Sequence, residues 1–164
     1  MPYTRPTTDI AKEGIFNILQ NNLEIDELKV LDLFGGTGCI SYELASRGAP
    51  DITIVEKDNK MYDFIKKTAA ALEFENFTVI KSDVFRFIET TAGQYDFIFA
   101  GPPYALATID ELPVKIFEKN ILKTCGWFVL EHTPRNDYKK FPKYKTERNY
   151  GSTIFSIFVN SNEQ

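Results

Sequence analysis

The chain has 164 residues, 43% of them hydrophobic and 26% charged, which is typical of one globular domain with a substantial core. No apolar run approaches the roughly 20 residues of a membrane-spanning helix, and the first residues show no signal-peptide pattern. The net charge of −4 argues against a general nucleic-acid binder. We therefore expect a cytoplasmic, monomeric protein in which residues 1–164 form a single domain without a membrane role.

The first predicted element is a helix within an N-terminal segment, residues 1–24, that precedes a sheet. Apolar residues recur at helical spacing after Thr7 and Thr8, and either threonine suits the N-cap position. The apolar positions are Ile10, Ile15, Phe16, Ile18 and Leu19.

Five short apolar runs follow, and their lengths suit strands that are buried on both faces of a parallel sheet. They are Val30–Phe34, Ile52–Val55, Phe77–Ile80, Phe97–Ala100 and Trp127–Leu130. Helices are expected at 39–47, 59–74, 84–91 and 109–122. This alternation predicts an open, doubly wound α/β sheet with right-handed crossovers.

The pattern changes after Pro134. Lys143–Tyr150 and Thr153–Asn160 are predicted to form two strands of a hairpin around Tyr150-Gly151-Ser152. A hairpin added to five parallel strands is typical of a methyltransferase domain and not of a dinucleotide dehydrogenase.

A glycine-rich loop, Gly35-Gly36-Thr37-Gly38, follows the first strand. In open α/β sheets, ligands bind beyond the carboxyl ends of the strands, and glycine lets the backbone approach them. A structural turn gives the same pattern, and Gly36–Ser41 also approximates a dinucleotide fingerprint that lacks its third glycine. Glu56, 20 positions after Gly36, suits the ribose hydroxyls of either NAD or S-adenosylmethionine.

Asp32 discriminates between these cofactors. A carboxylate inside an apolar strand is costly unless a cation or hydrogen bonds compensate it. A sulfonium cofactor with an α-ammonium group offers such compensation, whereas a pyrophosphate is anionic and would be repelled. The alternative is a structural acid that caps the glycine turn. Asp83, after the third strand, suits the amino group of adenine or the N-cap of the next helix.

Gly101-Pro102-Pro103-Tyr104 follows the fourth apolar run, where amino-group methyltransferases carry Asp-Pro-Pro-Tyr or Asn-Pro-Pro-Tyr. The two prolines remove N–H donors, so nearby carbonyls are left to accept hydrogen bonds from a flat amine. The tyrosine ring offers a face on which a base can stack. A Pro-Pro turn that leaves a strand is the plainer interpretation.

Residues 134–149 contain six Lys and Arg against two Asp and Glu, a local net charge of +4. Tyr138, Phe141 and Tyr144 lie between these cations. This composition favours phosphate contacts with stacking groups, although a solvated charged face gives the same pattern. The candidate contacts are Arg135, Lys139, Lys140, Lys143, Lys145 and Arg148.

Few residues of the sequence are typical ligands of a transition metal. Cys39 and Cys125 are far apart, and His132 is the one histidine. Because zinc sites and disulfide frameworks need clusters of such residues, we expect no metal and reduced cysteines. His132 follows the fifth strand and is expected to be a hydrogen-bonded structural residue.

Together these residues resemble the RsmD family, bacterial methyltransferases that modify N2 of a guanine in small-subunit ribosomal RNA. The similarity covers nearly the whole chain and is more specific than the glycine loop alone. Matching segments are Arg5-Pro6-Thr7-Thr8-Asp9, Leu31–Gly38, Arg47-Gly48-Ala49, Val55-Glu56-Lys57-Asp58, Gly101–Tyr104 and the Arg148-Asn149-Tyr150-Gly151 turn.

The resemblance implies a Rossmann-like class I methyltransferase fold with a seven-stranded, mostly parallel sheet and a C-terminal antiparallel hairpin. It implies S-adenosylmethionine as cofactor and ribosomal RNA or a pre-ribosomal small subunit as partner. Arg5 joins the expected RNA contacts, and Gly101, Pro102, Pro103 and Tyr104 the catalytic segment. The expected cofactor pocket comprises Asp32, Phe34, Gly35, Gly36, Thr37, Gly38, Glu56, Lys57, Asp83 and Val84.

Two features differ from the family pattern. The family usually has Asp at the position of Gly101, and a Gly- and basic-rich leader ahead of the segment that starts here at Arg5. Without that carboxylate we expect a slower enzyme, which Gly101→Asp accelerates if the pocket admits the side chain. The alternatives are an RNA-binding assembly factor that binds the cofactor without turnover, and an NAD-binding dehydrogenase-type domain.

Overall fold

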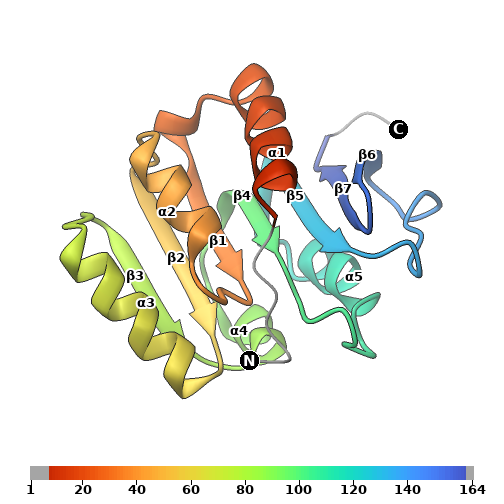
Figure 1. The fold of residues 1–164 in the computed structure, drawn as a ribbon. Coiled ribbons are helices and arrows are strands. Elements are labelled where there is room, and N and C mark those ends of the chain that lie inside the picture. Colours follow the sequence, from red (N-terminus) through yellow and green to blue (C-terminus); the bar gives the residue numbers. More distant parts are fainter. Residues whose placement is uncertain (1–7, 162–164) are drawn as a thin grey trace.

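The computed structural model describes residues 8–161, in which one mixed sheet of seven strands has the order β3-β2-β1-β4-β5-β7-β6 (Figure 1). The first five strands are mutually parallel, and β7 is antiparallel to both of its neighbours. The strands are β1 Lys29–Leu33, β2 Asp51–Glu56, β3 Phe77–Lys81, β4 Tyr95–Ala100, β5 Leu122–His132, β6 Tyr144–Tyr150 and β7 Thr153–Val159. The seven-stranded, mostly parallel sheet and its C-terminal hairpin are therefore confirmed.

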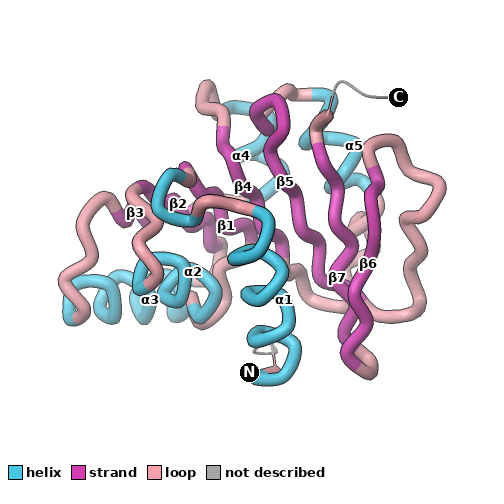
Figure 2. The backbone as a smooth tube through the Cα atoms, turned by 90° about the horizontal axis from the view of Figure 1, so that it is seen from above, coloured by secondary structure: helices cyan, strands magenta, loops and turns pink. Residues whose placement is uncertain are grey.

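Helices cover both faces of the sheet. Helices α1 Asp9–Asn22, α2 Cys39–Ser46 and α3 Asn59–Ala71 lie on one face, and α4 Val84–Thr90 and α5 Glu111–Glu118 lie on the other (Figure 2). A short 3-10 turn, Ile25–Glu27, joins α1 to β1. No helix in the described residues is long and apolar enough to cross a membrane.

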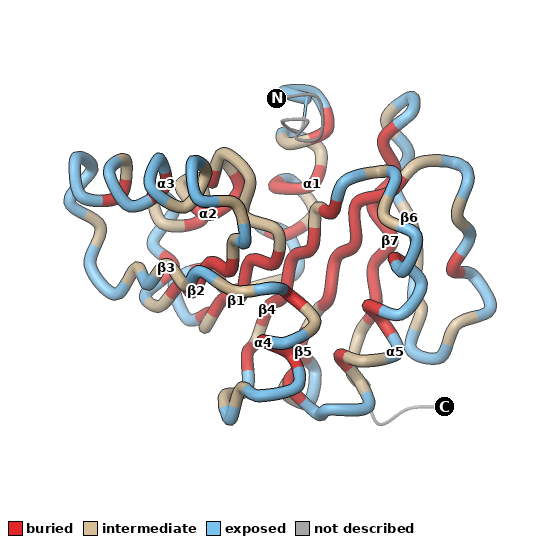
Figure 3. Tube along the Cα trace, turned by 90° about the horizontal axis from the view of Figure 1, so that it is seen from below, coloured by how far each residue is buried: buried red, intermediate tan, exposed pale blue. Residues whose placement is uncertain are grey.

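Side chains of the central strands alternate between two buried cores. Figure 3 shows that buried residues are concentrated along these central strands. Val30 and Phe97 pack on the side of α1, α2 and α3, whereas Leu31 and Ile98 pack on the side of α4 and α5. Burial on both faces explains why these strands are continuous apolar runs in the sequence. It also sets the direction of every residue at the carboxyl ends of the strands, because successive side chains point to opposite faces.

The N-cap of α1 is Thr8, whose hydroxyl oxygen accepts a hydrogen bond from the Ala11 N–H at 3.3 Å. Thr7, the other candidate, lies outside the described residues. The helix predicted at 109–122 is shorter than expected. Asn120 has a φ of 55°, a left-handed conformation that ends helices, and Leu122 already pairs with Tyr95 of β4.

Candidate active site at the carboxyl edge of the sheet

The buried acid of β1 lies on the face covered by α1 and α2. Asp32 is 2% exposed, and the Ser41 hydroxyl of α2 donates a hydrogen bond to its Oδ2 at 2.6 Å. Burial raises the pKa of Asp32 to about 7, and the negative charges of Glu56 and Glu131 act in the same direction against the Ser41 hydrogen bond. Asp32 is thus an acid whose ionised form would be favoured by a cation.

The glycine-rich loop turns sharply between β1 and α2. Phe34, Gly36 and Gly38 all have positive φ angles, of 61°, 59° and 83°, and the Gly38 N–H donates to the Gly35 carbonyl at 2.8 Å. Gly38 is the N-cap of α2. The loop therefore forms a tight turn directly after the strand that carries Asp32, and its role in ligand binding stays a prediction.

Glu56, at the end of β2, ties this loop to the next one. Its Oε1 accepts a hydrogen bond from the Gly36 N–H and its Oε2 from the Asp58 N–H, both at 2.8 Å. A carboxylate has about four lone-pair positions, so these two bonds leave acceptor capacity for ribose hydroxyls. Lys57 beside it is exposed, and Thr37 is half-buried.

Gly35 is required by close packing. A Cβ at this position would lie 2.3 Å from Ile54 Cγ2 and 3.1 Å from Ile65 Cδ1. We expect Gly35→Ala to lower the free energy of unfolding by about 1–3 kcal/mol, as overpacking does. Urea denaturation measures this, with Gly93→Ala as the matched control, because the nearest atom there is the Tyr95 hydroxyl at 3.2 Å. Equal losses in the two variants would contradict the steric explanation.

The residues after β3 have mainly structural contacts. Asp83 is the N-cap of α4, and its Oδ2 accepts a hydrogen bond from the Arg86 N–H at 3.1 Å. Val84 is 3% exposed and packs in the core on the side of α4 and α5. The capping alternative for Asp83 is therefore observed, at the same edge of the sheet as Asp32 and Glu56.

The segment after β4 begins beside the glycine loop, because the Gly101 N–H donates to the Leu33 carbonyl at 3.4 Å. Pro102 is buried and Pro103 is exposed. The Pro103 carbonyl accepts the Leu106 N–H at 3.0 Å, and the Pro102 carbonyl stays the predicted acceptor for a substrate amine. Tyr104 is half-buried, and its hydroxyl lies 3.3 Å from Thr153 Oγ1 of β7.

Sequence reasoning missed Glu131 at the end of β5. This residue is 4% exposed, and its Oε2 accepts a hydrogen bond from the Tyr104 hydroxyl at 2.9 Å. An acid directly after the apolar run 127–130 was the available signal, because Glu56 follows the run of β2 in the same way.

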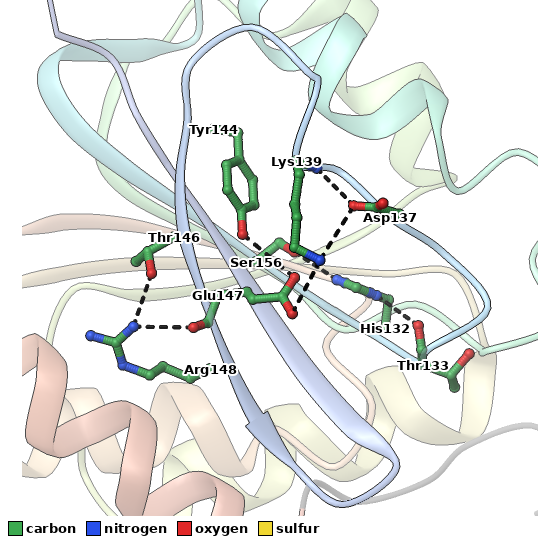
Figure 4. A network of polar contacts seen from close by, with 9 residues as sticks. All are labelled: His132, Thr133, Asp137, Lys139, Tyr144, Thr146, Glu147, Arg148 and Ser156. Carbon is green, nitrogen blue, oxygen red and sulfur yellow. Dashed lines mark hydrogen bonds and ion pairs between the residues drawn. The ribbon is translucent and has the colours of Figure 1, made fainter.

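His132 has a structural role, as expected. Its ring is buried, with Nε2 2.7 Å from Ser156 Oγ and Nδ1 2.8 Å from the Thr133 carbonyl oxygen (Figure 4). Burial lowers the pKa of His132, so the neutral imidazole is favoured.

The basic segment differs from its expected form. Tyr138 is fully buried and donates a hydrogen bond to Asp110 Oδ1 at 2.8 Å, so a base-stacking role for Tyr138 is wrong. Phe141 and Tyr144 also pack against the core on the side of α4 and α5. The aromatic residues between the cations therefore pack against the protein core. The residue pattern alone does not distinguish such core packing from stacking on nucleic-acid bases.

Several cations of this segment have partners within the protein. Lys139 Nζ lies 3.9 Å from Asp137 Oδ1 and 3.8 Å from Glu147 Oε2 (Figure 4). Lys143 Nζ donates to the Ser161 carbonyl at 2.7 Å, and Arg148 Nη1 to Thr146 Oγ1 at 3.0 Å. The remaining cations are exposed; they are Arg135, Lys140 and Lys145. Arg5 lies outside the described residues.

Two solved structures with the same architecture are described as methyltransferases. An RNA methyltransferase from Salinibacter ruber, in complex with S-adenosyl-L-homocysteine, has a TM-score of 0.75 at 14% identity and covers 98% of this chain and 96% of its own. The 16S rRNA N2 G1207 methyltransferase RsmC from Thermus thermophilus, in complex with AdoMet and guanosine, has a TM-score of 0.75 at 21% identity. The match covers 96% of this chain and 44% of the RsmC chain. The fold is thus the Rossmann-like class I methyltransferase fold.

Residues 1–159 match the family model described as conserved hypothetical protein 95. Ribosomal RNA small subunit methyltransferase D from Buchnera aphidicola is 28% identical over 166 residues, which cover 96% of this chain and 82% of that protein. The Escherichia coli K12 protein of the same name is 30% identical over 79% of this chain and 62% of its own length. The chain belongs to this family, the RsmD family, and the resemblance inferred from its motifs is confirmed.

Proposed function

We propose that this chain transfers a methyl group from S-adenosylmethionine to the exocyclic N2 of a guanine in small-subunit ribosomal RNA. The main observation behind this proposal is that the predicted cofactor site and the predicted substrate segment lie at the same edge of the sheet. A buried carboxylate of β1 and a half-buried one of β2 lie beside the loop Gly35–Gly38, and the segment Gly101–Tyr104 follows β4, the strand between β1 and β5. The two relatives above are named as small-subunit ribosomal RNA methyltransferases, which supports the same class of substrate.

The residues at this edge fit the cofactor. S-adenosylmethionine supplies, when bound, a methyl group on a positively charged sulfur. Asp32 favours a cation because burial has raised its pKa to about 7, and a nearby positive charge restores its ionised form. Glu56 retains acceptor capacity for ribose hydroxyls, and the positive φ angles of Gly36 and Gly38 allow close approach of the loop backbone.

The protein's part in the chemistry is to position the amine. A nitrogen lone pair forms the new N–C bond while the C–S bond breaks and its electron pair remains on sulfur. The nitrogen becomes cationic in this step and then loses one proton. The Pro102 carbonyl, at the carboxyl edge of the sheet, holds the amino group in place. Acceptors for the N–H groups of this amine stabilise the positive charge that develops on its nitrogen.

Exposed cations of the basic segment are proposed to contact RNA phosphates. We expect the triple variant Arg135→Gln, Lys140→Gln, Lys145→Gln to bind ribosomal RNA more weakly, with a salt dependence flatter by up to about one unit of slope per lost contact. Filter binding at several salt concentrations measures both effects. The control is Lys60→Gln, Lys66→Gln, Lys67→Gln on α3, three exposed lysines on another element. Equal behaviour of the two triple variants would identify residues 134–149 as a solvated face.

Transfer of tritium from labelled S-adenosylmethionine tests the function itself. Substrates are deproteinised small-subunit RNA, assembled small subunits and duplex DNA, and digestion to nucleosides identifies the modified base. We expect N2-methylguanosine from one of the two RNA substrates and no label in DNA. A labelled adenine or cytosine would overturn the guanine assignment. Cofactor binding without any transfer would identify a binding factor without turnover.

A further inference from the structure

The space beside Gly101 adjoins a carboxylate from the neighbouring strand. A Cβ at position 101 would lie 3.5 Å from Glu131 Oε1 and 3.1 Å from Phe99 Cε2. Any side chain at position 101 would therefore approach the volume that the Glu131 carboxylate occupies. Glycine at this position leaves that volume to Glu131.

Glu131 is held firmly in this place. It directly follows Leu130, which pairs with Ala100 of β4, and on its other side it pairs with Phe155 of β7. Its Oε2 accepts the Tyr104 hydroxyl at 2.9 Å. Val129 and Val30 both face α1. Because residues two positions apart in a strand point to the same face, Glu131 and Asp32 also face that side of the sheet.

The strand order places the predicted cofactor-binding residues and Glu131 on different sides of β4. Asp32 and Glu56 lie on β1 and β2, beside the glycine loop, whereas Glu131 lies on β5, on the opposite side of β4. A base seated on Pro102, Pro103 and Tyr104 would lie between these groups. Glu131 is therefore on the substrate side of Gly101.

We propose that Glu131 is a catalytic residue whose Oε1 accepts an N–H of the amino group that is methylated, in the role that a carboxylate at position 101 would otherwise fill. This inference rests on the proposed function and deepens it. The lone pair of an aromatic amine is delocalised into the ring, and an N–H acceptor favours the pyramidal, cationic nitrogen of the transition state. After the N–C bond forms and the C–S bond breaks, the N–H bond breaks and its proton passes to Oε1, from which water removes it.

Glu131→Gln keeps the shape of the side chain and removes its charge. We expect turnover on ribosomal RNA to fall by about 10²-fold, while affinity for S-adenosylhomocysteine is retained. The matched control is Glu89→Gln on α4, an exposed glutamate paired with Lys115 and Lys119. Tyr104→Phe removes only the hydroxyl that binds Oε2, and we expect it to cost less than Glu131→Gln.

Transplantation of the carboxylate provides the sharper test. Gly101→Asp in the Glu131→Gln background is expected to recover at least about tenfold in turnover, because the acceptor then comes from β4. In the wild-type background, Gly101→Asp places a second carboxylate in the volume beside Glu131. Because the two negative charges repel, we expect the Gly101→Asp protein to have a lower melting temperature at pH 8 than the Gly101→Asn protein. The melting difference should disappear once Glu131 is Gln, a result that requires no turnover.

The outcomes separate this inference from the proposed function. If the wild type transfers methyl groups and Glu131→Gln is equally active, Glu131 is not the acceptor and the proposed function stands. If Tyr104→Phe loses as much turnover as Glu131→Gln, Glu131 acts through Tyr104 and the catalytic assignment is overturned. If the wild type transfers none, the proposed function fails first, and the assignment falls with it.

Discussion

Asp32→Asn is expected to stabilise the ligand-free protein at pH 8 by up to about 4 kcal/mol, because each unit of pKa shift corresponds to about 1.36 kcal/mol. The pKa of Asp32 is raised by burial from 3.8 to about 7. Asparagine retains a carbonyl oxygen that can accept the Ser41 hydroxyl and carries no charge to desolvate.

The pH dependence follows from the direction of that shift. Between about pH 4 and pH 7 the folded protein holds a proton on Asp32 that the unfolded chain has released, so the stability of the wild type falls as pH rises. This contribution is fully present below about pH 4 and is lost above about pH 7. The difference between Asp32→Asn and the wild type should therefore grow from pH 4 to pH 8.

Urea denaturation of both proteins at pH 4.5 and pH 8 measures this difference. The same variant should bind S-adenosylmethionine more weakly at pH 8, because it has lost the negative charge that faces the cation. A variant that is less stable than the wild type at pH 8, or that binds the cofactor equally well, would show that Asp32 is a structural cap of the glycine turn.

Glu56→Ala is expected to weaken binding of S-adenosylhomocysteine by at least about 10²-fold. Two N–H groups, those of Gly36 and Asp58, lose their acceptor, and an unsatisfied donor costs about 1–3 kcal/mol. The ribose hydroxyls lose their acceptor as well, and about 1.4 kcal/mol corresponds to a tenfold change in affinity.

Isothermal titration measures this affinity, with Glu43→Ala on α2 as the control. Glu43 is a partly exposed glutamate that pairs with Arg47 and Lys12 away from the glycine loop. Equal affinities of Glu56→Ala and Glu43→Ala would remove Glu56 from the cofactor site.

The fold was predictable because each buried strand is a short apolar run between helix-length polar segments. The one marked error, the helix expected at 109–122, arose because Ile121 and Leu122 are as apolar as helix residues. The left-handed Asn120 and the pairing of Leu122 with Tyr95 depend on the neighbouring strand, which the local pattern does not contain.

The site was only partly predictable. Asp32, the glycine loop and Glu56 are recognisable because each stands directly at the end of its own strand. The relation between Gly101 and Glu131 spans two strands and 30 positions, so neither residue alone indicates it. The sequence predicted a slow enzyme for want of a carboxylate at position 101, and Glu131 provides a carboxylate in the adjoining volume. If Glu131 is the acceptor proposed above, Gly101→Asp does not accelerate the enzyme, and turnover of that variant tests the two accounts against each other.

Titration of the purified chain with S-adenosylhomocysteine and, separately, with NAD is the most direct test of the cofactor site formed by Asp32, the glycine loop and Glu56. We expect one site for S-adenosylhomocysteine, whose ammonium group can face an acid, and no binding of NAD, whose pyrophosphate would meet the carboxylates of Asp32 and Glu56. Binding of NAD without binding of S-adenosylhomocysteine would contradict this site and identify a dehydrogenase-type domain instead.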